Sequence, residues 1–71
     1  MVFATGSTEI SREKIDGRVE EVVVRTRGAW HEACILGWDG EPRTVWKYPK
    51  LEQAQEKAAI AKTWLAEGRL W

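Results

Sequence analysis

The sequence has too few reactive side chains to assemble a familiar catalytic or metal site. Its 71 residues include one cysteine and one histidine, so no intramolecular disulfide can form and no Cys/His cluster can hold a structural zinc. It contains no G-x-S-x-G, Walker-type or dinucleotide motif. We therefore expect a protein that is not an enzyme and that needs no metal and no cofactor.

His31 and Cys34 are the remaining candidates for a catalytic pair. They lie three residues apart in a segment with the composition of a strand, and side chains three apart in a strand point to opposite faces of the sheet. We expect a histidine that is hydrogen-bonded to a neighbour and a cysteine that acts as a small, half-buried apolar residue.

Long apolar runs and an excess of one charge are also missing. No run approaches the ~18 apolar residues of a membrane span, and the start MVFATGSTEI lacks the basic and apolar regions of a secretory signal. We therefore expect a cytoplasmic protein with no membrane partner. Eleven Lys and Arg balance eleven Asp and Glu, which argues against a protein that coats nucleic acid by bulk charge.

The length allows one domain, whose single core leaves only a few kcal/mol of net stability. We expect residues 1–17 to form an N-terminal arm and residues 18–71 to form one small β-β-β-α domain. The arm has few apolar residues, and its sequence leaves three structures open. It could be a loose segment, a short helix capped by Ser7 or Thr8, or an extra strand that turns at Asp16-Gly17.

The remaining sequence predicts three strands followed by a helix. Strands rich in β-branched and aromatic residues are expected at about 19–26, 29–38 and 43–48, with tight turns at Arg27-Gly28 and Asp39-Gly40. Pro49 suits the first position of a helix that ends near Glu67, with Gly68 as its stop. Apolar residues share one stripe of this helix: Leu51, Ala54, Ala58, Ala61 and Leu65, with Ile60 and Trp64 at its flank. The predicted fold class is α+β, a three-stranded antiparallel meander packed against one C-terminal helix.

Two-residue turns would fix which side chains share a face of the sheet. One face would be nearly uncharged and would receive the helix: Val22, Val24, Thr26, His31, Ala33, Ile35, Thr44, Trp46 and Tyr48. The opposite face would combine aromatic and basic residues: Val23, Arg25, Arg27, Trp30, Glu32, Cys34, Leu36, Trp38, Arg43, Val45 and Lys47. With these turns Arg25 would oppose Trp30, and Val23 would oppose Glu32. A neutral chain would thus present a locally positive sheet.

Five tryptophans are more than so small a core needs. Trp46 is expected in the core, and Trp64 and Trp71 are expected to pack near the helix end. Trp30 and Trp38 would lie at opposite ends of the second strand on the basic face. They would either meet a partner or be covered by the arm or by a second subunit.

The order of a basic strand, a tryptophan strand, GEPRTVW, an aromatic residue and LEQAQEKAAIA resembles the AP2-type DNA-binding domain. It is also similar to the arm-type N-terminal domains of tyrosine recombinases. The resemblance covers about residues 22–65. It implies a three-stranded sheet that enters the DNA major groove, with an alanine-rich helix behind it. By position it implies DNA-facing roles for Arg25, Arg27, Trp30 and Arg43, an aromatic position before the helix at Tyr48, and helix packing at Ala54 and Ala58.

The sequence therefore predicts a non-enzymatic binding module that uses the outward face of its sheet. Double-stranded DNA is the first expected partner, with basic side chains on phosphates or base edges and tryptophans stacking. The alternative is a protein partner or self-association, because tryptophan and arginine are the residue types that interface hot spots favour. The same candidate site serves both hypotheses: Arg25, Arg27, Trp30, Trp38, Arg43 and Lys47.

Overall fold

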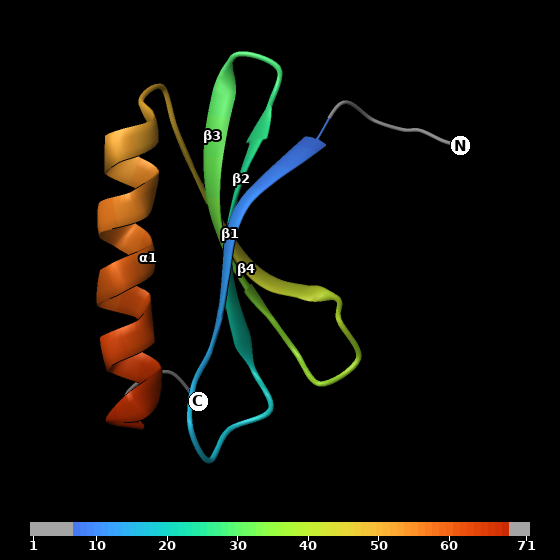
Figure 1. The fold of residues 1–71 in the computed structure, drawn as a ribbon, viewed down its shortest axis with the longest axis vertical. Coiled ribbons are helices and arrows are strands. Elements are labelled where there is room, and N and C mark those ends of the chain that lie inside the picture. Colours follow the sequence, from blue (N-terminus) through green and yellow to red (C-terminus); the bar gives the residue numbers. More distant parts are fainter. Residues whose placement is uncertain (1–6, 69–71) are drawn as a thin grey trace.

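The protein is a four-stranded antiparallel sheet with one helix on one face, as the computed structural model in Figure 1 shows for residues 7–68. The elements in chain order are β1 (Ser7–Lys14), β2 (Glu21–Arg27), β3 (Trp30–Leu36), β4 (Pro42–Tyr48) and α1 (Leu51–Ala66). The strands lie in the sheet in the same order as in the chain. The predicted α+β class with a C-terminal helix is confirmed, but the sheet has four strands and the prediction of three was wrong.

The additional strand is β1, so the third structure left open for the N-terminal segment is the one that forms. The chain reverses after β1 through a turn in which the Arg18 N–H donates to the Ile15 carbonyl oxygen at 3.1 Å and Gly17 adopts a positive φ of 78°. Only glycine adopts that φ without steric cost. Ile15 is buried and belongs to the core. The sequence signal for β1 was weak because Ile10 forms a bulge between Glu9 and Ser11, which interrupts the alternation of outward and inward residues.

The hairpin of β2 and β3 turns one residue later than predicted. Its turn residues are Gly28 and Ala29, with Gly28 at a φ of 61°, in place of Arg27-Gly28. Arg25 therefore opposes Glu32, and Val23 opposes Cys34. The predicted partners were wrong by two residues, but a shift of two preserves the faces because side chains alternate with a period of two.

The hairpin of β3 and β4 contains two irregularities that cancel. Its loop is longer than the predicted two residues, because the Gly37 N–H donates to the Glu41 carbonyl oxygen at 2.9 Å. The strand pairing then shifts between Ile35 and Leu36. The bulge restores the register that the longer loop displaced, so Cys34 opposes Val45 as predicted.

The helix covers the face of the sheet that carries Val22, Val24, Ala33 and Ile35, here called the inner face. The predicted stripe is confirmed, since Ala54, Ala58, Ala61 and Leu65 are its buried residues. The prediction that Pro49 opens the helix was wrong, because α1 begins at Leu51 after an extended Lys50. Gly68 has a φ of 75° and its N–H donates to the Leu65 carbonyl oxygen, which is the expected glycine stop. Among residues 7–68 no helix has the length and apolar character that a bilayer crossing requires.

Candidate binding site on the outer sheet face

The face of the sheet opposite the helix, here called the outer face, carries the candidate site. Its centre is a second apolar cluster of Val23, Cys34 and Leu36, which are all buried although α1 lies on the other side. In Figure 1, β1 and the hairpin of β3 and β4 both curve away from the helix. The outer face is concave, because two hollows that share Arg12, Leu36 and Gly40 lie on it.

One row of the outer face alternates in charge across all four strands. Glu9 of β1 opposes Arg25 of β2, Arg25 opposes Glu32 of β3, and Glu32 opposes Lys47 of β4. Opposite charges on directly paired residues stabilise an antiparallel sheet, whereas like charges destabilise it. This arrangement corrects the expected excess of positive charge, because β1 and the true register of β2 bring acids next to the basic residues.

Arg25 and Glu32 of this row form a largely buried ion pair. The Arg25 Nε donates to Glu32 Oε1 at 2.6 Å, and the Glu32 side chain is only 2% exposed. Burial alone would lower the pKa of Arg25, but its hydrogen bond to Glu32 and the negative charges nearby together outweigh burial and raise that pKa. Arg25 was predicted to contact a ligand, and in the structure it is hydrogen-bonded to Glu32. Because the Glu32 carboxylate is buried, water cannot readily take the place of Arg25.

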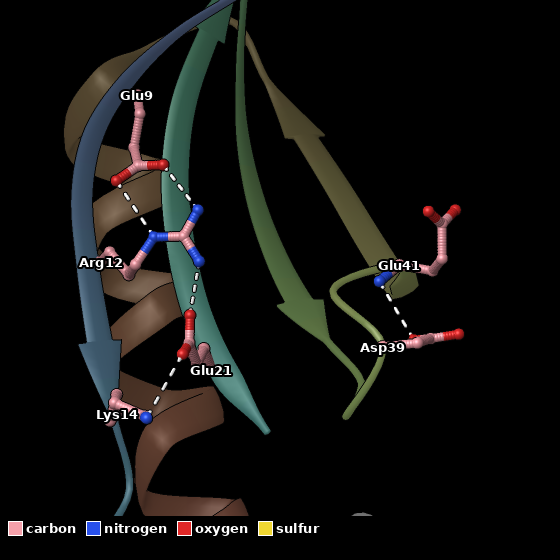
Figure 2. A network of polar contacts seen from close by, with 6 residues as sticks. All are labelled: Glu9, Arg12, Lys14, Glu21, Asp39 and Glu41. Atoms are coloured by element: carbon pink, nitrogen blue, oxygen red, sulfur yellow. Dashed lines mark hydrogen bonds and ion pairs between the residues drawn. The ribbon is translucent and has the colours of Figure 1, made fainter. Parts of the chain in front are cut away.

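Arg12 of β1 links two rows of the outer face (Figure 2). It donates to both carboxylate oxygens of Glu9, with the shorter contact at 2.8 Å, and it also donates to Glu21 of β2. Lys14 lies 3.8 Å from the other Glu21 oxygen. The bond from Arg12 lowers the pKa of Glu9. This network ties the edge strand β1 to β2 across the outer face.

Arg43 is held by its own hairpin. Its Nη2 lies 3.0 Å from Asp39 Oδ1, and the same oxygen accepts the Glu41 N–H at 3.1 Å (Figure 2 shows the second contact). The backbone bond from Glu41 and the charge of Arg43 lower the pKa of Asp39. The guanidinium also lies against Gly37, where a Cβ would stand 2.5 Å from Arg43 Nε. Arg43 therefore braces the loop of this hairpin.

The outer face is hollowed. A hollow of about 320 Å³, here called the outer hollow, has Val23 and Leu36 on its floor and Arg12, Arg25 and Pro42 on its walls. A second hollow of about 410 Å³ continues past Leu36 toward Trp38 and Lys14. Apolar floor and charged walls together suit a ligand that has both apolar and polar groups.

The two candidate tryptophans stand at opposite ends of the outer face. Trp30 is 51% exposed and opposes Arg27 at the β2 end. Trp38 is 78% exposed and lies in the loop after β3 rather than at the end of the strand, where it was predicted. Lys47 is exposed in the row next to Trp30. The fold thus groups Arg27, Trp30 and Lys47 at one end and leaves Trp38 and Arg43 at the other.

Sequence reasoning missed the acidic partners of the basic residues. Glu9 and Arg12 could not be assigned to this face without knowing that β1 exists and where its bulge lies, whereas Glu21 follows the alternation of Val23 and Arg25. Asp39 could have been found, since it precedes Arg43 by four residues across a short hairpin loop. Glu32 was placed on the correct face, but its pairing with Arg25 required the true turn at Gly28-Ala29.

His31 and Cys34 lie apart, as predicted from their spacing. The His31 Nδ1 is 2.9 Å from the Thr26 hydroxyl, while Cys34 belongs to the outer cluster. Burial raises the pKa of the Cys34 thiol, so the reactive thiolate is disfavoured. No group of three or more His, Cys, Asp or Glu side chains within residues 7–68 is arranged to hold a metal ion.

Comparisons with known proteins found no relative of this chain. No family model, no curated protein and no solved structure matches the chain. The resemblance to AP2-type and arm-type DNA-binding domains therefore stays a prediction from sequence pattern.

Proposed function

We propose that the protein is a non-enzymatic protein-binding module that holds its partner on the concave outer face. The observation that carries the proposal is the pair of exposed tryptophans, Trp30 and Trp38, at the two ends of a face whose arginines are already paired with carboxylates. Tryptophan supplies a large apolar area at low entropic cost and is the residue type most enriched among interface hot spots.

The paired arginines favour a protein over a DNA duplex as the partner. A phosphate would compete with Glu32 for Arg25, and drawing Arg25 away would leave a buried carboxylate without its partner. It would likewise compete with Asp39 for Arg43. A duplex therefore gains little from two of the four basic residues that the DNA hypothesis requires, whereas a protein partner can use the tryptophans without disturbing either pair.

The charges of the outer face indicate the chemistry of the partner. Six basic residues face four acids there: Arg12, Lys14, Arg25, Arg27, Arg43 and Lys47 against Glu9, Glu21, Glu32 and Asp39. The excess is modest, and Lys47 brings part of it next to Trp30. The fitting partner is a protein segment with an aromatic or aliphatic side chain for Trp30 and a carboxylate beside it.

The test is a selection from a displayed random peptide library, followed by titration of the selected peptides. We expect peptides that combine acidic and large apolar residues, with binding reduced about tenfold or more by Trp30→Ala or Trp38→Ala. Trp64→Ala is the matched control, because Trp64 lies on the helix, away from the outer face. Circular dichroism would establish that each variant remains folded.

A parallel titration with labelled duplex separates the two classes of partner. Counterion release predicts a log-log salt slope of roughly −0.9 for each phosphate contact. If the protein binds duplex with a slope near −3.6, about four phosphates are contacted and DNA is the partner in place of a protein. Peptide binding that depends on Trp30 and changes little with salt supports the proposal.

A further inference from the structure

The two edge strands of the sheet are protected to different degrees. β1 has a bulge at Ile10, four charged residues among its eight, and ion pairs to β2 and, through Lys62 and Glu13 at 3.5 Å, to the helix. Bulges and charges are the usual means by which proteins prevent edge strands from pairing with other chains. The β1 edge is thus closed to a further strand.

Between Thr44 and Tyr48 the β4 edge has neither a bulge nor a proline. From Thr44 to Tyr48 its pairing with β3 is regular, and Lys47 is the one charged residue of the five. Within residues 7–68 no strand pairs with the far side of β4. Its outward N–H and C=O groups form a template for another strand, and its β-branched and aromatic residues suit a sheet.

We propose that β4 pairs with β4 of a second copy of this chain, antiparallel and centred on Trp46, to form an eight-stranded sheet. A two-fold axis at Trp46 places Trp46 opposite its own copy, Thr44 opposite Tyr48 and Val45 opposite Lys47. Aromatic pairs and pairs of an aromatic with a β-branched residue are among the most stabilising on a sheet. All five regular residues take part, which is the largest overlap that this segment allows.

Charge selects this register over its neighbours. A register centred on Val45 would set Arg43 opposite Lys47 twice, and one centred on Lys47 would set the two lysines opposite each other. Like charges directly opposite destabilise an antiparallel pair. In the register centred on Trp46, the Lys47 stem lies along Val45 of the other copy and its ammonium reaches water. Because the chain has no net charge, two copies carry no overall repulsion.

The helix continues the same surface beside β4. The Lys57 Nζ lies 5.3 Å from the Trp46 ring and 5.2 Å from the Trp64 ring, which places this flank of α1 next to β4. Ile60 lies on that flank, one turn from both Lys57 and Trp64, and is 38% exposed. Pairing through β4 brings the two helix flanks together, so Trp46, Ile60 and Trp64 of both copies lose contact with water.

This inference is independent of the proposed partner on the outer face. The two outer faces would lie side by side on one sheet, so a dimer would present two binding faces in the same direction. A partner with two copies of the recognised segment would then bind with avidity.

The experiment measures the mass of the protein in solution from about 1 µM to about 1 mM, the range of weak and moderate affinities. We expect the mass to rise to twice the 8.1 kDa of the chain. A mass that stays at 8.1 kDa over the whole range overturns the proposal.

Two substitutions of Val45 with opposite charges test the register. Val45→Lys sets lysine opposite Lys47 twice and should weaken dimerisation about tenfold or more, whereas Val45→Glu sets a carboxylate there and should strengthen it. Ile10→Lys is the matched control on the β1 edge, since Ile10 and Val45 are 43% and 38% exposed. A dimer that responds equally to Val45→Lys and Val45→Glu, or that Ile10→Lys disrupts as strongly as Val45→Lys, overturns pairing through β4.

The helix flank gives a second measurement that does not touch the sheet. Ile60→Glu should weaken the dimer several-fold, because it places a charge in the joined flanks, while Ala59→Glu on the outward side of the same helix should leave it unchanged. Equal dimerisation of both variants and the unmodified protein would remove the helix from the interface and overturn the arrangement proposed here.

Discussion

The two faces of the sheet shield their apolar residues from water in different ways. The inner face is covered by the helix and consists of apolar residues packed on alanines, with Trp46, Tyr48 and Leu51 at its margin. The outer face has no covering element among the described residues, yet it buries Val23, Cys34 and Leu36 beneath a lattice of ion pairs from β1, β2 and the hairpin loop. Packing holds the first face, and paired charges shield the second and leave the tryptophans exposed.

The largest expected loss of stability comes from truncating two adjacent residues of β3, one on each face of the sheet. Ile35 faces the helix and is fully buried, while Leu36 faces outward and is 8% exposed. Ile35→Ala should cost about 2–5 kcal/mol and unfold much of so small a domain. Leu36→Ala should cost less, because it enlarges a hollow that is already open to water. Urea denaturation measures both, and equal costs would show that the outer cluster is a core in its own right.

The ion pair of Arg25 and Glu32 tests how much paired charges on the outer face contribute to stability. Arg25→Ala leaves Glu32 buried without its partner and should cost about 2–3 kcal/mol, less than the full cost of breaking a buried pair because Arg25 is partly exposed. The double variant Arg25→Met, Glu32→Leu removes both charges and should regain most of that loss. If the double variant is as unstable as Arg25→Ala, the pair contributes more than compensation of a buried charge.

The alanine stripe of the helix tests how closely the inner face is packed. Ala58 is 6% exposed and lies against the sheet. Ala58→Leu should overpack this contact and cost about 1–3 kcal/mol. Ala59→Leu adds the same side chain to the exposed side of the helix and should change stability little. An unchanged denaturation midpoint for Ala58→Leu would remove this part of the helix from the core.

The inner face was predictable from sequence and the outer face only in part. The stripe from Ala54 to Leu65 and the alternation of β2 depend on local periodicity, which survives an error in a turn. The register needed both turns. A turn one residue later than predicted changed the β2–β3 pairing by two residues and left the faces intact, and the bulge near Leu36 cancelled the longer loop. The ion pairs depend on contacts between strands and on β1, whose bulge at Ile10 hides its pattern. The residues that neighbour each charge in the sequence do not indicate such contacts.

The smallest expected effect is a difference between the two faces in how their contribution to stability depends on pH. The folded-state pKa of Asp39 is lowered by the Glu41 N–H and by Arg43, from an ordinary value of 3.8. A lowered folded-state pKa contributes stability above the unfolded-state pKa, and this stability is lost as the pH falls through the folded-state value. Asp39→Asn should therefore be slightly less stable than the unmodified protein near pH 7, and the two should converge below about pH 3.

The matched control for this pH dependence is Ile35→Val on the inner face. The residues of the inner face are apolar and lie against apolar residues. The stability cost of Ile35→Val, about 0.5–1.5 kcal/mol, should therefore be the same at every pH at which the protein folds. Denaturant titrations of the three proteins between about pH 2 and pH 7 give the comparison. A constant difference for Asp39→Asn over that range would mean that Asp39 keeps its ordinary pKa in the folded protein. The negative charge of Asp39 would then add no stability to the loop bond with Glu41 or to the contact with Arg43.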